Sequence, residues 1–516
     1  MTSLLLPPRE VPLESLLESF SNQTHIDELR VCLDFIDSNE EFAVIFNSLL
    51  NRQVTVSKFV VFRQSPLTPL FPFSCTLVSS GLAQFVAKAR VASLDFSGLC
   101  SGAISSTPAL CPFSFFFSSL YHFKPVVSNL KSISLKGAVF PTTTAVSSFV
   151  DLLLSLHSLQ YLSLVSCNLL PAFIPIFSRF FRSSSCLIAL DFSNNPRFSL
   201  SFNNSHAFSS STIVLSSLNL SGTRIETGFY ESLVENTMFH SNLKELDVSN
   251  FLVTDLGILN LSKFVSLSNL SKLVLKSVGL TNIHCSLLGR AINEVKTVEY
   301  LDVSDNSQID GDGCASLIDG NDCLISLNLS ATNVGKAFDL FVDLLVNSKL
   351  SNLIANDCSF LNSATESFIK VLGFLETLSL DCSIVEPDLF FSIFERVTSS
   401  PLKNLSLKNI QSVFNFSAEK VYSMFESLFN SYKELKSLDL SGTFTTHNSM
   451  ILLLNQNFLN LCKKNNQMEQ LFLIEGSNTF DLLSSSELFS PPEPPSFFFI
   501  VLFRSFNVTS LRTYYF

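Results

Sequence analysis

The sequence contains none of the short signatures by which common enzyme active sites are recognised. It has no GxSxG nucleophile elbow, no HExxH zinc motif, no P-loop and no GxGxxG dinucleotide fingerprint. Its 7 histidines are isolated from one another, and its 12 cysteines form neither a CxxC pair nor a Cys/His cluster at zinc-ligand spacing. These absences predict a protein that is not an enzyme and that binds no cofactor and no metal.

Positive charge and long apolar runs are also lacking. The formal net charge is −11, whereas nucleic-acid binding requires a basic face that neutralises phosphates. No apolar stretch approaches the roughly 20 residues that a membrane-spanning helix needs. The first ten residues contain two prolines and then Arg9 and Glu10, where a signal peptide would have an apolar run. We therefore expect a cytoplasmic monomer with reduced cysteines, no nucleic-acid partner and no integral membrane segment.

One phrase, Leu-x-x-Leu-x-Leu or a close apolar variant, recurs along the chain. Most intervals lie between 25 residues (Leu350 to Leu375) and 29 residues (Leu130 to Leu159). Weaker matches begin at Ile26, Val56 and Val508. Such periodicity is not produced by chance and indicates a repeat architecture. The clear phrases begin at Val91, Leu130, Leu159, Leu187, Leu215, Leu243, Leu270, Val298, Leu324, Leu350, Leu375, Leu402, Leu435 and Met468.

Within each phrase the last two leucines alternate with polar residues, so they point to one side of a short strand. Parallel stacking of these strands would bury a ladder of leucines that one repeat alone cannot bury. Eight residues after the first leucine, a small polar side chain is expected to satisfy backbone groups in the turn that follows. This position holds Cys167, Asn195, Thr223, Asn306, Thr332, Cys358, Ser383 and Thr443.

The remainder of each repeat is long enough for a returning helix of about three turns. Apolar residues recur there at helical spacing, which predicts helices over residues 337–346, 364–372, 387–397 and 417–430. Pro387 is suited to a first helical turn, and Ser417 and Asp312 to N-cap positions. We expect an α/β leucine-rich-repeat solenoid (a horseshoe), with parallel strands on the concave face and helices on the convex face.

These features resemble the ribonuclease-inhibitor-like class of leucine-rich repeats, which includes ribonuclease inhibitors, Ran GTPase-activating proteins and the CARMIL family of actin-capping regulators. Between Leu215 and about Phe480, phrases such as LNLSGTRI and SPLKNLSLKN are most similar to CARMIL repeats. The resemblance implies a role in actin regulation or signalling. The alternative that it implies is an activator of a Ran-type GTPase, for which Arg224 would be the arginine finger.

The spacing predicts three regions. Residues 1–90 form a flank with degenerate repeats, 91–480 the solenoid, and 481–516 a cap rich in proline and phenylalanine with a partial last repeat. In this cap, the apolar run Phe497–Phe503 is expected to fold back over the leucines of the repeat that begins at Met468.

An acidic cluster between Asp302 and Asp322 invites a calcium site, but its spacing does not match an EF-hand loop. The position between the two strand leucines is more informative, because it is mostly small and polar and carries five carboxylates along the expected concave face. We predict that this face binds a protein partner, and that its side chains face solvent and tolerate replacement by lysine without loss of the fold. The residues predicted to contact the partner are Asp95, Asp191, Asn219, Asp247, Asp302, Asn328 and Asp439.

Overall fold

The computed structural model describes the repeats in two compact units, Met1–Leu270 and Ser271–Phe516. We refer to them as unit 1 and unit 2 and describe each by itself. The described residues are 3–5, 24–32, 53–62, 76–98, 120–122, 129–138, 142–183, 186–200, 214–361, 372–397, 400–410, 422–426, 434–443, 470–472, 498–499 and 514–515, with single residues 47, 49, 51, 140, 370 and 428.

Unit 1 is a parallel sheet in which each strand pairs with the next one along the chain. The two degenerate phrases at Ile26 and Val56 supply strands of this sheet, as do the regular phrases from Val91 to Leu243. The strands are β1 (Ser3–Leu5), β2 (His25–Cys32), β3 (Thr55–Phe62), β4 (Ser93–Gly98), β5 (Ser132–Lys136), β6 (Tyr161–Val165), β7 (Ala189–Asp191), β9 (Ser217–Asn219) and β11 (Glu245–Asp247).

Unit 2 repeats the arrangement with shorter strands, again paired in parallel and in chain order. They are β12 (Lys272–Val274), β13 (Tyr300–Asp302), β14 (Ser326–Asn328), β15 (Asn352–Ile354), β17 (Thr377–Ser379), β19 (Asn404–Ser406), β20 (Ser437–Asp439) and β21 (Gln470–Phe472). Every clear phrase in the sequence therefore forms a strand at its expected place. The Val508 phrase lies outside the described residues.

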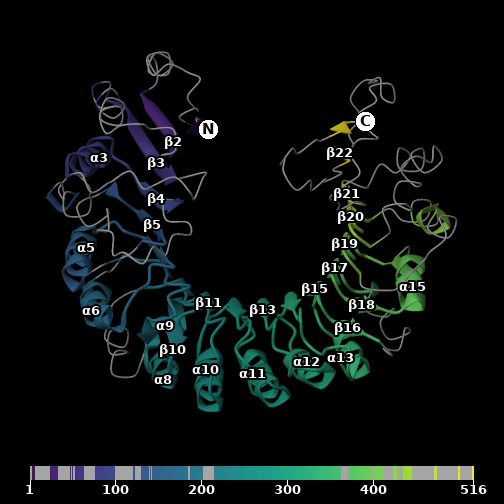
Figure 1. Ribbon diagram of the computed structural model, residues 1–516. Helices are drawn as coiled ribbons and strands as arrows, with labels where there is room; N and C mark the ends of the chain where they lie inside the picture. The colour runs from purple at the N-terminus through teal and green to yellow at the C-terminus, as the bar shows by residue number, and fades with distance from the viewer. Residues whose placement is uncertain are drawn as a thin grey trace. The chain divides into compact units, whose positions relative to one another are not determined.

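Helices cover the opposite side of each sheet, and several neighbouring helices pack against one another (Figure 1). In unit 1 these are α3 (Thr76–Lys88), α5 (Thr143–Ser155), α6 (Ile174–Ser183), α8 (Thr227–Glu235), α9 (Thr237–Asn242) and α10 (Asp255–Leu267). In unit 2 they are α11 (Asn282–Val295), α12 (Gly311–Ile318), α13 (Phe338–Leu345) and α15 (Pro387–Val397). A 3-10 turn, η3 (Pro171–Phe173), precedes α6.

The helix prediction is confirmed for 387–397, where Pro387 begins α15, and for 337–346, within which α13 lies. One cap was wrongly assigned. Asp310, not Asp312, is the N-cap of α12, because its side chain accepts from the backbone N–H groups of Asp312 and Gly313. Most of the helices predicted over 364–372 and 417–430, including Ser417, lie outside the described residues.

The core of each unit is the predicted leucine ladder between sheet and helices. Leu190 pairs in register with Leu218, and Leu301 with Leu327, and all four side chains are buried. Phenylalanine fills wider spaces, as where Phe177 meets Phe192 edge to face at 5.4 Å. The described residues thus confirm an α/β leucine-rich-repeat solenoid with strands on one side and helices on the other.

Short second strands flank the main sheets where the chain turns into the helices. In unit 1, β8 (Ser199–Leu200) pairs with β10 (Arg224–Ile225), and in unit 2, β16 (Ser359–Phe360) pairs with β18 (Ile384–Val385). Within the predicted cap, β22 (Phe498–Phe499) pairs antiparallel with β23 (Tyr514–Tyr515) and contacts β21. The rest of the apolar run Phe497–Phe503 lies outside the described residues.

Candidate partner-binding face

The residues predicted to bind a partner lie in one row on the side of each sheet that faces away from the helices. We call this side the strand face. In unit 1 the row is continuous by register and consists of Asp95, Ser134, Ser163, Asp191, Asn219 and Asp247. In unit 2, Asp302 and Asn328 are register partners on β13 and β14, and Asp439 lies on β20. The register therefore brings the predicted residues together within each unit.

Most of these side chains also hold the turn that follows their strand. The Oδ1 atom accepts a hydrogen bond from the backbone N–H two residues later, which is an Asx-turn. The distances from that nitrogen to Oδ1 are 2.9 Å for Asp191, 3.0 Å for Asn219, 3.0 Å for Asp247, 2.9 Å for Asp302, 3.1 Å for Asn328 and 2.9 Å for Asp439. The repeated Asp/Asn-x-Ser spacing was the signal for this role, and the sequence reasoning did not use it.

The expectation that these side chains simply face solvent is therefore wrong in part. Asp302 is only 8% exposed, and the others are half-buried. A lysine has no acceptor and cannot replace the Oδ1 of an Asx-turn. Asparagine is the better replacement for removing the charge, because its side-chain oxygen keeps the acceptor of the turn. Asn219 and Asn328 already hold the same turn in this way.

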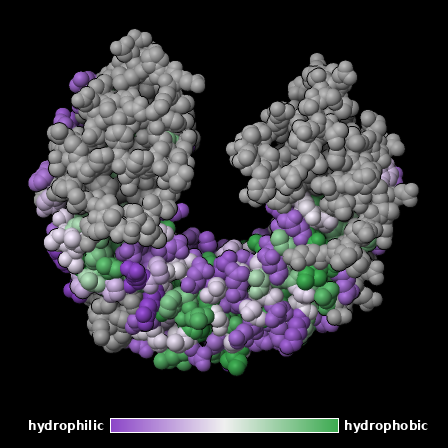
Figure 2. Space-filling model, viewed as in Figure 1, coloured by the Kyte–Doolittle hydropathy of each residue, from purple (hydrophilic) through white to green (hydrophobic). Residues whose placement is uncertain are grey.

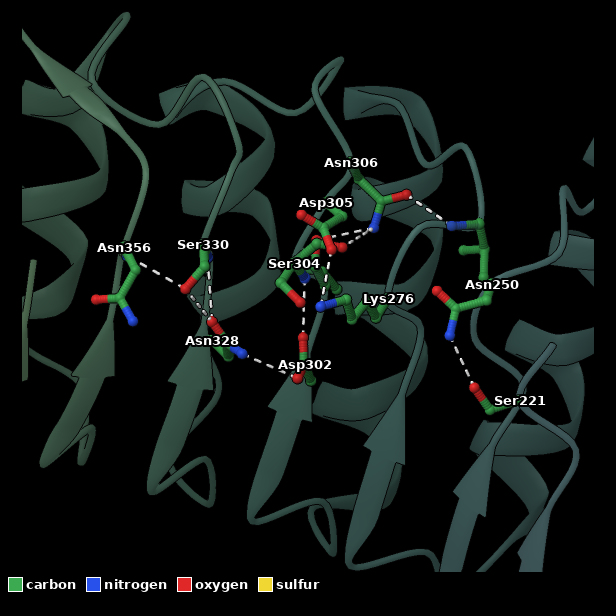
Figure 3. A network of polar contacts seen from close by, with 12 residues as sticks. Ser221, Asn250, Lys276, Asp302, Ser304, Asp305, Asn306, Asn328, Ser330 and Asn356 are labelled. Carbon is green, nitrogen blue, oxygen red and sulfur yellow. Dashed lines mark hydrogen bonds and ion pairs between the residues drawn. The ribbon is translucent and has the colours of Figure 1, made fainter. Parts of the chain in front are cut away.

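In unit 2 the strand face is tied together by side chains of neighbouring repeats (Figure 3). Asn328 Nδ2 donates to Asp302 Oδ2 at 2.9 Å, and Asn328 Oδ1 accepts from Ser330 Oγ at 2.7 Å. Ser330 Oγ in turn accepts from the backbone N–H of Asn356 at 3.2 Å. Nearby, Lys276 Nζ lies 2.8 Å from Asp305 Oδ2, and this hydrogen bond raises the pKa of the lysine. Most of the hydrogen-bonding groups named here therefore have partners within the protein.

The helix side of unit 1 presents apolar surface instead. Leu252 is 75% exposed, and Leu256, Leu259 and Leu267 are also exposed along α10. Figure 2 shows the corresponding hydrophobic area over this helix. Contiguous exposed apolar surface often marks a contact site, so the helix side is the rival to the strand face for any partner.

The acidic residues between Asp302 and Asp322, whose spacing does not match an EF-hand loop, serve separate local roles. Asp302 holds an Asx-turn, Asp305 binds Lys276, Asp310 caps α12, and Asp322 lies 3.5 Å from Lys296 Nζ. In the part of the chain that the structure describes, no group of three or more His, Cys, Asp or Glu side chains is arranged to hold a metal ion. Nor does any described helix combine the length and apolarity that crossing a membrane would require.

The nearest approach to a catalytic arrangement is His25 beside Asp27 and Ser57. Ser57 Oγ at 3.2 Å and Asp27 Oδ1 at 3.5 Å both approach the same ring nitrogen, Nε2, while Nδ1 meets Thr55 Oγ1 at 2.8 Å. A hydrolytic triad needs the serine and the carboxylate on opposite nitrogens, so this is not one. Burial raises the pKa of the Cys285 thiol to about 12 and raises that of Cys314 as well, which makes both poor nucleophiles at neutral pH.

Arg224, the expected arginine finger, lies on β10 in register with Ser199. Its side chain is exposed, and its Nε lies 3.8 Å from Glu226 Oε1. The guanidinium thus has an acidic neighbour within its own repeat.

Two tyrosines on the strand face were not anticipated. Tyr161 on β6 and Tyr300 on β13 both occupy the third position of the leucine phrase, two residues before the row of polar residues. The alternation of strand side chains predicts that this position shares the strand face, so the sequence did contain the signal.

Comparisons with known proteins identify no family for the chain. No protein-family model matches it, and no curated protein does. One similar solved structure is that of a TLR13–ssRNA13 complex, with 15% identity and a TM-score of 0.41 over 88% of this chain and 75% of that chain. Another is the complex of Rad7 and Elc1 in yeast, with 14% identity and a TM-score of 0.40 over 72% of this chain and 83% of that chain.

Proposed function

We propose that this chain is a non-catalytic scaffold that binds a protein partner on its strand face. The observation that carries the proposal is the row of polar side chains at one structural position of successive strands. A row fixed by strand register and by Asx-turns is held rigidly, and a rigid surface pays little ordering entropy when a partner binds. Solenoids commonly bind through such extended surfaces.

The resemblance of the repeats to CARMIL proteins suggests a finer role in actin regulation or signalling in the cytoplasm, with the chain acting as a monomer. The Ran-type activator is the alternative. Arg224 is exposed and lies 3.8 Å from Glu226, an exposed contact weak enough to be released readily, so the alternative is decided by experiment. Arg224→Ala should leave stimulation of a small GTPase unchanged if the scaffold proposal is right. A loss of about 1,000-fold, the scale of an arginine-finger effect, would favour the alternative.

The test is site-specific photo-crosslinking from the full-length chain in cell lysate. A benzophenone amino acid is placed at Ser132 or Ser326 on the strand face, or at Leu256 or Leu340 on the helix side. All four side chains are at least partly accessible, and none makes a hydrogen bond that holds a turn. We expect a protein adduct, identified by mass spectrometry, from the strand-face positions. Adducts from Leu256 or Leu340 alone would contradict the proposal and assign binding to the helix side.

A further inference from the structure

On the strand face of unit 1, Tyr161 exposes its aromatic ring among small neighbours. Tyr161 is 37% exposed, and its register partners on the adjacent strands are Ser132 and Ala189. Neither neighbour is large enough to cover the ring. The face of Tyr161 is therefore accessible to a flat group arriving from outside.

Two carboxylates flank this ring. Asp95 and Asp191 lie in the adjacent row, separated by Ser134 and Ser163, so they are three strand spacings or about 14 Å apart. Burial is the main cause that raises the pKa of the Tyr161 hydroxyl, and Asp191 and Asp95 both raise it further, whereas a hydrogen bond with Ser163 lowers it. Both carboxylates are thus close enough to Tyr161 to influence the ionisation of its hydroxyl.

Among the described residues, Asp191 forms a hydrogen bond through one of its two carboxylate oxygens. Its Oδ1 accepts from the backbone N–H of Ser193 at 2.9 Å, and no described residue is bound to its Oδ2. Asp302, the equivalent residue in unit 2, differs because its Oδ2 accepts from Asn328. The carboxylate of Asp191 therefore keeps an acceptor for an external donor.

Tyr300 occupies the equivalent position in unit 2, where a cation lies beside the ring. Lys272 is its register partner, and the lysine Nζ lies 5.4 Å from the centre of the Tyr300 ring. This is the geometry of a cation–π contact. At Tyr161 the register partners are uncharged, and no described lysine or arginine lies over the ring. Lys136 is in register with Val165, four residues or about 13 Å along β6.

We propose that the strand face of unit 1 binds an extended, arginine-containing segment of a partner protein, with one guanidinium over Tyr161 and others at Asp95 and Asp191. This rests on the proposed function and specifies the chemistry of its partner. Arginine is favoured over lysine because a planar guanidinium stacks on an aromatic face and also pairs with carboxylates. An extended chain advances about 3.3 Å per residue, so arginines at alternate positions span about the distance between the two carboxylates. Tyr161 lies one strand from Asp191 and two strands from Asp95, which puts the ring within reach of the middle arginine.

The experiment measures binding of a fluorescein-labelled peptide, Gly-Arg-Ser-Arg-Ser-Arg-Gly, to the full chain by fluorescence anisotropy. Tyr161→Leu should weaken binding about tenfold, whereas Tyr161→Phe, which keeps the ring, should stay within about twofold. Asp191→Asn should weaken binding about threefold to tenfold. It removes the charge but retains an acceptor for the Asx-turn, as Asn219 does. Thermal melts check that each variant is folded.

Matched controls separate this site from general attraction to an acidic protein. Tyr300→Leu and Asp439→Asn change the equivalent positions in unit 2 and should leave peptide affinity unchanged. A peptide of the same composition with contiguous arginines, Gly-Ser-Arg-Arg-Arg-Ser-Gly, should bind more weakly. The proposal is overturned if Tyr161→Leu has no effect, or if Tyr300→Leu costs as much affinity.

The two proposals fail in different ways. If Ser132 gives partner adducts but peptide affinity does not depend on Tyr161, the scaffold function is retained and recognition of an arginine-containing segment is excluded. Partner adducts confined to Leu256 and Leu340, with peptide binding that depends on Tyr161, would support arginine recognition while excluding the strand face as the site of the crosslinked partner.

Discussion

At the residue scale, a buried polar side chain organises the turn that leaves the strand in many of the repeats. Asn306 is the fullest example. Its Nδ2 lies 2.8 to 3.0 Å from the carbonyls of Leu275, Val303 and Ser304, and its Oδ1 accepts from the backbone N–H groups of Val278, Gly279 and Leu280 at 2.9 to 3.1 Å. Elsewhere a threonine or a cysteine does part of this work. Thr223 Oγ1 donates to Phe192 O at 2.8 Å, and Cys167 Sγ to Leu135 O at 3.6 Å.

Asn306→Ala should lower the free energy of unfolding by about 3 kcal/mol or more, because it leaves several buried backbone groups without partners. Asn306→Thr should cost less than the alanine substitution, since threonine holds this position in the repeats of Thr223 and Thr332. Urea unfolding followed by circular dichroism measures both. Equal stability of the alanine and threonine variants would show that the hydrogen bonds of this side chain contribute little.

The sequence predicted this polar position but not the backbone conformation just before it. In repeat after repeat the preceding residue has positive φ, as at Asn194 (57°) and Gly222 (66°). Glycine and asparagine adopt that region readily, so they signal it in their repeats. Ala331 (53°) and Cys382 (57°) occupy the same position with no such tendency, so their repeats carry no signal of it.

At the element scale, stacking of successive helices sets limits that the hydrophobic pattern does not reveal. A Cβ added to Gly289 on α11 would lie 1.9 Å from the carbonyl oxygen of Ser316 on α12. Apolar spacing predicted where α15 lies, and Asp310 showed that a cap can be misassigned by two residues. Such spacing cannot report how closely two helix backbones approach. That distance depends on the packing of neighbouring repeats.

Gly289→Ala tests this close approach. Helix propensity alone would stabilise the variant by about 1 kcal/mol, but overpacking typically costs 1–3 kcal/mol and here meets rigid backbone. We expect a net loss of about 1–2 kcal/mol in denaturant unfolding. Gly373→Ala is the control, because a Cβ added there would lie 3.3 Å from its nearest neighbour, Lys370 O, which is close but far less crowded than at Gly289. A more stable Gly289→Ala variant would show that α11 and α12 can separate without penalty.

At the scale of the whole molecule, the spacing of leucines was sufficient to predict the fold class and the row of candidate residues. It could not distinguish residues that hold turns from residues left to bind, because both kinds are Asp or Asn at the same position. Asp302 and Asp191 each have an asparagine as register partner, Asn328 and Asn219, but Asp302 is buried and accepts from Asn328, whereas Asp191 is half-buried. The boundaries at residues 90 and 480 stay predictions, while the chain groups into two compact units, Met1–Leu270 and Ser271–Phe516.

The net charge of −11 makes a final prediction about association rates. An acidic protein steers a basic segment toward itself over a distance set by salt, about 30 Å at 0.01 M and about 3 Å at 1 M. The association rate constant of the arginine-spaced peptide should therefore fall about tenfold between low and high salt. The dissociation rate should change little, because contact with Tyr161 is short-ranged. Stopped-flow anisotropy measures both rates, and a peptide with citrulline in place of arginine provides the uncharged control. Apolar docking on the leucines of α10 would instead give an association rate that is independent of salt.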